Sequence, residues 1–140
     1  MSTDSRIYFI NRLVIIAVAL VLPLGACGDN RVSQKTNDHF VSITITNDQI
    51  DIPIPDPVTV HGNHAVLHWE IKTAGYTFPD DGIVVGDDAG SEFSGGHTAD
   101  HGTKFQINDK NSFSKTYKYT IKVLKGSIPL APRDPTIANG

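Results

Sequence analysis

The sequence predicts an all-β fold, an antiparallel Greek-key β-sandwich, and three observations lead to this prediction. Apolar and polar residues alternate through most of the chain after residue 39, as in strands with one buried face. Gly, Pro, Asn and Asp separate the alternating stretches at short intervals, which is typical of turns. No segment after residue 26 shows the 3.6-residue period of an amphipathic helix. About seven short strands with regular turns are typical of two packed sheets.

The first predicted strand covers residues 40–46, FVSITIT. Val41, Ile43 and Ile45 fall on one face of this strand, and hydroxyl side chains fall on the other. The sequence NDQ at residues 47–49 then predicts a turn.

Residues 57–71 predict a β-hairpin. Gly62-Asn63 is a two-residue turn signal, and pairing across it sets Val60 opposite Ala65. With this register, every second residue of both strands lies on one apolar face, so the register and the hydrophobic pattern agree.

The remaining strands follow the same logic. Residues 78–86 predict a turn and a short apolar strand, and residues 102–124 predict two alternating strands around a turn at NDKNS. After Gly126 come Pro129, Pro132 and Pro135, which are too many for an interior strand. We therefore expect a sandwich domain over residues 39–126 and, over 127–140, an extended tail at an edge or on the outside.

The N-terminus reads as a signal peptide over residues 1–26. Arg6 and Arg12 provide positive charge, and ten apolar residues follow at positions 13–22. As a helix, ten residues span about 15 Å, which is half of the roughly 30 Å hydrocarbon core of a bilayer. A transmembrane helix is therefore the weaker interpretation.

The four residues Leu24-Gly25-Ala26-Cys27 close this segment and hold the only cysteine of the chain. They resemble the lipobox of bacterial lipoproteins. The resemblance implies that the Cys27 sulfur receives a diacylglyceryl group, with fatty acids such as palmitate, and becomes the mature N-terminus. Gly28 stands where an aspartate favours retention in the inner membrane, so the outer membrane is mildly preferred. The alternative is an ordinary secretory signal with a chance cysteine.

Residues 27–38 would then link the lipid to the domain as a flexible tether, with a typical reach of about 18 Å. The mature chain loses Asp4, Arg6 and Arg12, so 10 of the 12 basic and 14 of the 15 acidic residues remain, for a net charge of −4. This balance argues against a nucleic acid as partner, because phosphate binding needs clustered Lys and Arg.

Two stretches resemble the cupredoxin fold. VTVHGNHAVLHW, at 58–69, resembles a Val-rich strand, a Gly turn and a strand that ends in an aromatic residue. YKYTIKVLKG, at 117–126, resembles the strand that carries the copper-binding cysteine and histidine, but Ile121 and Leu124 occupy those two positions. Blue copper needs a Cys thiolate, two His and usually a Met, and the mature chain lacks both Cys and Met ligands. An immunoglobulin-like sandwich is the alternative fold.

The histidines are the first candidate metal ligands. The predicted hairpin places His61 and His64 opposite each other, with Cβ atoms about 5 Å apart, so that they can share a divalent ion. His97 and His101 lie in the Gly-rich stretch GGHTADHG, where a loop can fold around Zn²⁺ or Cu²⁺. The alternatives are a solvent-exposed hairpin face and a solvated loop.

A second candidate is a calcium site in the acidic stretch at residues 79–93. Asp80, Asp81, Asp87 and Asp88 supply the hard oxygen ligands that Ca²⁺ prefers, although their spacing does not match the EF-hand loop. The alternative is that these charges keep a surface loop solvated.

For catalysis the chain contains no GxSxG elbow, no P-loop and no dinucleotide fingerprint. We therefore expect a periplasm-facing envelope lipoprotein with a non-catalytic binding domain, whose partner is an envelope protein or a small ligand. The alternative is a Zn- or Cu-binding periplasmic domain that uses the histidine pairs.

Overall fold

The computed structural model describes residues 37–140. The predicted signal peptide, Cys27 and the predicted tether up to residue 36 lie outside the described residues. Residues 37–140 belong to one compact unit, and every residue of the hydrophobic core comes from within them. This segment therefore contains a complete core of its own.

The described residues form thirteen short strands and two 3₁₀ turns, η1 (Asp87–Ala89) and η2 (Asp100–Gly102). The strands are β1 (Asn37–Ile43), β2 (Ile45–Thr46), β3 (Gln49–Ile50), β4 (Val58–Val60), β5 (Ala65–Ile71), β6 (Tyr76–Thr77), β7 (Ile83–Val85), β8 (Phe93–Ala99), β9 (Lys104–Asp109), β10 (Thr116–Ile121), β11 (Leu124–Lys125), β12 (Ile128–Pro129) and β13 (Thr136–Asn139).

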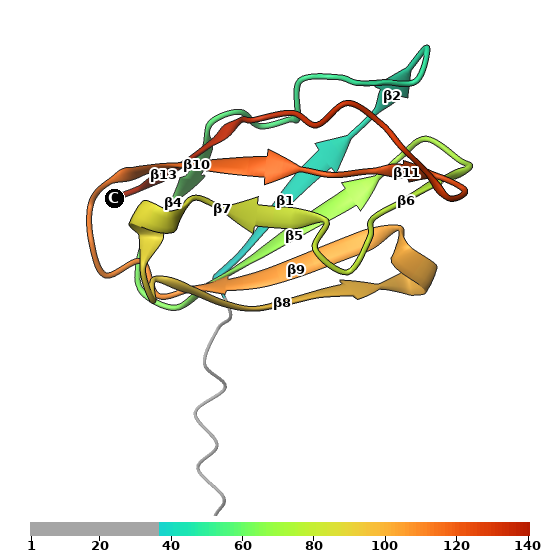
Figure 1. Cartoon of the computed structure of the whole chain (residues 1–140). Helices are drawn as coiled ribbons and strands as arrows, with labels where there is room; N and C mark the ends of the chain where they lie inside the picture. The colour runs from blue at the N-terminus through green and yellow to red at the C-terminus, as the bar shows by residue number, and fades with distance from the viewer. Residues whose placement is uncertain (1–36) are drawn as a thin grey trace, which may run out of the picture. The chain divides into compact units, whose positions relative to one another are not determined.

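Eight of these strands form two four-stranded sheets in the orders β1-β5-β9-β8 and β4-β13-β10-β7. The two sheets pack face to face (Figure 1), which confirms the predicted all-β sandwich. Each sheet contains one parallel pair, β1 with β5 and β4 with β13, beside antiparallel pairs. β1 and β4 lie in different sheets.

The predicted inward faces are confirmed. The alternating apolar positions of the long strands are buried between the sheets: Val41, Ile43, Val58, Val60, Ala65, Leu67, Trp69, Phe105, Ile107, Tyr117, Tyr119 and Ile121. Trp69 is 0% exposed, and its Nε1–H donates to Tyr119 Oη at 3.2 Å, which links the two sheets. Burial raises the pKa of Tyr119 to about 12, so this hydroxyl stays protonated at physiological pH.

The predicted hairpin at Gly62-Asn63 is wrong. The backbone of Val60 pairs with Asn139 in one sheet, whereas Ala65 lies between Asn37 and Asp109 in the other. Residues 61–64 therefore carry the chain from one sheet to the other. Alternation with a period of two determines which face of a strand is buried, but it leaves the pairing partner open.

The predicted tail is also wrong. β13 lies between β4 and β10 in the interior of its sheet, and Ile137 is 0% exposed. The three prolines all precede β13, so residues 136–139 keep the backbone N–H groups that an interior strand needs. The sandwich domain therefore extends to residue 140 and begins at Asn37 rather than at residue 39.

Candidate binding groove

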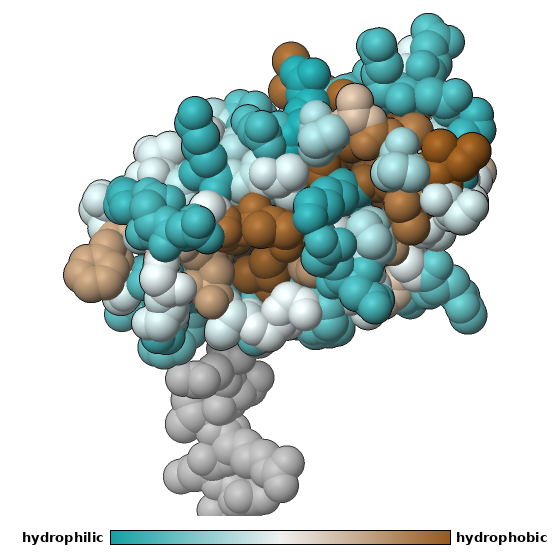
Figure 2. All heavy atoms as spheres, in the orientation of Figure 1, coloured by the Kyte–Doolittle hydropathy of each residue, from teal (hydrophilic) through white to brown (hydrophobic). Residues whose placement is uncertain are grey.

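An apolar groove runs between β7 and β8, which are the edge strands of the two sheets on one side of the sandwich. Figure 2 shows hydrophobic side chains exposed in a hollow at the middle of this side, bordered by polar ones. The groove has a volume of about 400 Å³, which is within the range of small-molecule sites.

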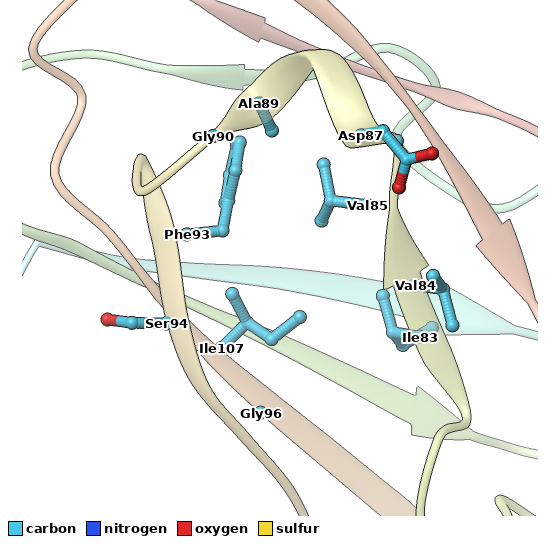
Figure 3. Close-up of a pocket in the computed structure, with 11 residues that line it drawn as sticks. Ile83, Val84, Val85, Asp87, Ala89, Gly90, Phe93, Ser94, Gly96 and Ile107 are labelled. Carbon is cyan, nitrogen blue, oxygen red and sulfur yellow. The ribbon is translucent and has the colours of Figure 1, made fainter.

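The walls of the groove come from both sheets. β7 contributes Ile83 and Val85, whereas β8 and β9 contribute Phe93 and Ile107 (Figure 3). Val84 belongs to the same strand as Ile83 and Val85, but its side chain points away from them and is 41% exposed. The complete lining is Ile83, Val84, Val85, Gly86, Asp87, Ala89, Gly90, Phe93, Ser94, Gly96 and Ile107.

Gly96 keeps the floor of the groove open. A Cβ atom at this position would lie 3.3 Å from Ile107 Cγ1 and 3.4 Å from Phe105 Cε1, which is closer than most real Cβ contacts. The register of β8 against β9 also shifts between Ser94 and His97. A bulge of this kind is common at sheet edges and re-aims the strand.

The rim on β7 also offers backbone polar groups. Lys122 N–H donates to Gly82 O at 2.7 Å, and Gly86 N–H donates to Lys118 O at 3.0 Å. Because hydrogen bonding alternates along an antiparallel strand, Ile83 and Val85 direct their N–H and C=O groups away from β10, towards the groove. The groove therefore combines apolar walls with hydrogen-bonding groups at one rim, as ligand sites commonly do.

The structure does not bring His61 and His64 into the predicted cross-strand pair. Both side chains are exposed in the 61–64 crossover. His61 instead lies near His39, whose pKa is lowered by burial and by the positive charge of His61.

His97 and His101 lie apart from that pair. His97 is part of β8 and opposite Gln106, and its Nδ1 is 2.8 Å from Gly95 O, so residues 95–99 form a strand rather than the predicted loop. His101 lies in η2, beyond the far end of β8. Since His64 precedes the first residue of β5 and His101 lies beyond the other end of this strand, about 20 Å separates these two histidines. His97 lies across β9 from His68, in the middle of β5. Within residues 37–140, no three His, Cys, Asp or Glu side chains form a group able to hold a metal ion.

The four predicted calcium ligands are not brought together either. Asp81 pairs with Lys122 at 2.6 Å, and Asp88 pairs with Lys115 at 2.7 Å. Lys115 and Lys122 flank the two ends of β10, so these carboxylates lie at opposite ends of that strand. Hydrogen bonds from the two lysines lower the pKa values of Asp81 and Asp88. Asp80 precedes β7 in the chain and Asp87 follows it, and both side chains are exposed.

One polar cluster was not predicted from the sequence. Asp109 is 1% exposed, and its Oδ1 accepts hydrogen bonds from Asn111 N–H at 2.8 Å and from Asn139 Nδ2 at 3.2 Å. Three further buried atoms, His39 Nε2, Asp109 Oδ2 and Asn139 Oδ1, have no hydrogen-bond partner among the described residues. Burial raises the pKa of Asp109. The cluster lies next to the buried side chains of both sheets. The sequence does not predict it, because it depends on which strands lie side by side.

The sequence predicts Ile83, Val85 and Ile107 only as parts of strands and does not predict a groove between them. The apolar residues 83–85 predict a buried strand and the alternation of residues 105–107 predicts an inner face, but no sequence signal shows which strands become edges. These walls form a groove only because β7 and β8 lie on the same side of the sandwich.

No helix within residues 37–140 has the length and apolarity that crossing a membrane requires. A scan against models of known protein families finds no match for this chain. A search of curated proteins also finds no significantly similar sequence.

Proposed function

We propose that this chain is a bacterial envelope lipoprotein, anchored through a lipid on Cys27, whose β-sandwich is a non-catalytic binding module. The groove between β7 and β8 is its binding site and takes an apolar group of a small ligand or of an envelope protein. The observation that carries the binding role is this open groove of about 400 Å³, with apolar walls and a rim where Ile83 and Val85 direct their backbone groups away from β10.

The resemblance to cupredoxins supports a scaffold without a copper role. Ile121, at the position that matches the copper-binding cysteine, is 0% exposed and packs in the core. An apolar side chain there contributes to packing and has no atom that ligates copper.

The groove is tested with N-phenyl-1-naphthylamine, a neutral probe whose fluorescence increases in apolar sites, on residues 34–140. Val85→Lys places a charge in the wall of the groove and is expected to weaken probe binding about tenfold or more, because an unpaired charge is costly beside an apolar ligand. Ile128→Lys is the control, since its side chain is 66% exposed and does not line the groove. Equal affinities for the two variants contradict the groove as the site.

The anchor is tested in the full chain by metabolic labelling with an alkyne analogue of palmitate. The wild-type protein is expected to incorporate the label and fractionate with membranes, because two or more acyl chains give stable anchoring. Cys27→Ser is expected to lose both properties. Label that persists in this variant, or a wild-type chain that carries none, contradicts the lipoprotein assignment.

A further inference from the structure

Three of the most exposed large apolar side chains gather beside the first strand. Phe40 is 70% exposed, Ile52 is 60% exposed and Ile54 is 73% exposed. The other large apolar side chains with high exposure, Val84, Phe113 and Ile128, belong to β7, to the β9–β10 connection and to β12. Single exposed apolar residues are ordinary, whereas a contiguous group on one face is typical of an interaction surface.

The backbone pairing makes the group contiguous. Ser42 and Ile54 exchange two hydrogen bonds, of 2.9 and 3.1 Å, so these two residues are directly opposite and share the outer face of the sheet. Phe40 precedes Ser42 by two residues and lies on that same face, diagonal to Ile54, which is within reach of an aromatic ring. We call Phe40, Ile52 and Ile54 the apolar stripe.

Ile52 joins the stripe because Pro53 is buried between Ile52 and Ile54, which places both isoleucines on the solvent side. The ring of Phe40 stacks on His68 with centroids 4.9 Å apart and an interplanar angle of 14°. This contact supports one face of the Phe40 ring. The stripe remains open to solvent in the part of the chain that the structure describes.

The position of the stripe along the chain indicates what covers it. Only nine residues, 28–36, separate Cys27 from Asn37, where β1 begins. A chain of nine residues spans at most about 32 Å, which is close to the diameter of a domain of this size. Phe40 is three residues beyond that point. A lipid on Cys27 would therefore hold Phe40 within about one domain diameter of the bilayer, and weak apolar contacts suffice there because the tether raises their effective concentration.

The charged residues around the apolar stripe favour one kind of bilayer. Residues 37–56 contain no Lys or Arg, and the acidic residues near the stripe accept hydrogen bonds: Asp38 from His68, Asp51 from Thr44 and Thr46, and Asp56 from Thr136 N–H. Anionic lipids attract basic segments, so this surface suits zwitterionic lipid better.

We propose that the apolar stripe rests on the headgroup–acyl boundary of the zwitterionic bilayer that holds the Cys27 lipid. The stripe orients the sandwich against the membrane surface. This inference rests on the proposed lipidation of Cys27 and adds a second, non-covalent contact to it.

The test uses the full lipidated chain in phosphatidylcholine vesicles that contain a doxyl-labelled lipid as quencher. Ile54→Cys provides the site for a fluorescent NBD label, and because Cys27 is the only native cysteine and is acylated, the new thiol reacts alone. Ile128→Cys is the matched control, with a native side chain of similar exposure at 66%. Quenching at residue 54 is expected to exceed quenching at residue 128 by about twofold or more, as for a group buried 5–10 Å into the interface.

Two further variants and one mass measurement make the result decisive. Adding Phe40→Ser to the labelled chain is expected to reduce quenching at residue 54, whereas adding Phe113→Ser is expected to leave it unchanged. Equal quenching at residues 54 and 128, with lipid on Cys27 confirmed by mass spectrometry, overturns the docking proposal and leaves the anchor intact. A mass without lipid overturns the anchor instead.

Discussion

Asp109 and His39 are ionisable side chains that face the inside of the sandwich, where ionisation is costly. Each retains one buried atom without a hydrogen-bond partner among the described residues. Burial is the largest cause of both pKa shifts, and it raises the pKa of Asp109 and lowers that of His39, so each group favours its neutral form. The groups that act on them electrostatically are His61, Asp38 and Glu92, besides each other.

For Asp109, a pKa raised in the folded state means that the carboxyl contributes stability below its unfolded pKa of 3.8, and that this contribution is lost as the pH rises through the folded pKa. Asp109→Asn keeps an oxygen acceptor for Asn111 N–H and removes the charge. We expect this variant to be more stable than the wild type at pH 7, by about 1–3 kcal/mol, and to lose the advantage near pH 3. Urea unfolding of residues 34–140 at both pH values measures this, and a variant less stable at pH 7 contradicts it.

For His39, a lowered pKa means that stability is present above the unfolded pKa of 6.5 and is lost as the pH falls through the folded pKa. The wild type is therefore expected to lose stability on acidification below pH 6.5. His39→Gln is uncharged and is expected to lose less over the same range. Thermal unfolding of both proteins between pH 7.5 and pH 5 provides the comparison. Parallel curves would show that another group causes the acid sensitivity.

At the level of the elements, sequence alternation predicts the buried face of each strand but leaves its neighbours undetermined. Val58 and Ala65 are buried as expected, yet they belong to different sheets. The partner of β4 is β13, the most distant strand in the sequence. Long-range pairing of this kind depends on how the two faces pack against each other, and a local turn signal such as Gly62-Asn63 carries no information about that.

The interior position of β13 gives the element-level prediction. Ile137→Ala removes a side chain that is 0% exposed and is expected to destabilise residues 34–140 by about 2–5 kcal/mol, the usual cost of a core cavity. Ile128→Ala, on β12, removes the same atoms from a side chain that is 66% exposed and is expected to change stability by less than about 0.5 kcal/mol. Similar losses in urea unfolding for both variants would contradict an interior β13.

For the whole molecule, the structure separates the features that the sequence grouped together. His61 and His64 lie at one end of β5, and His101 lies at the other. The acidic residues at positions 81 and 88 form separate ion pairs. Residues 37–140 instead form the groove between β7 and β8 and the apolar stripe near Asn37.

A metal titration tests the alternative function at this scale. Calorimetric titration of residues 34–140 with Zn²⁺ or Cu²⁺ is expected to show no dissociation constant below about 10 μM, a free energy of about −7 kcal/mol. Tighter binding that disappears in the variant His61→Ala or His97→Ala would favour the metal-binding function over the proposed one.

The sequence by itself determined the fold class and the buried faces of β1, β4, β5, β9 and β10, because burial of one side of a sheet imposes a two-residue period that is visible locally. It also predicts where a lipid would be attached, since the residues before Cys27 resemble a local motif, the lipobox. Only the tertiary structure decided which strands pair, that residues 136–139 lie inside a sheet, and where the groove and the apolar stripe lie. These features depend on contacts between residues far apart in the chain, and the energy of such contacts leaves no local pattern in the sequence.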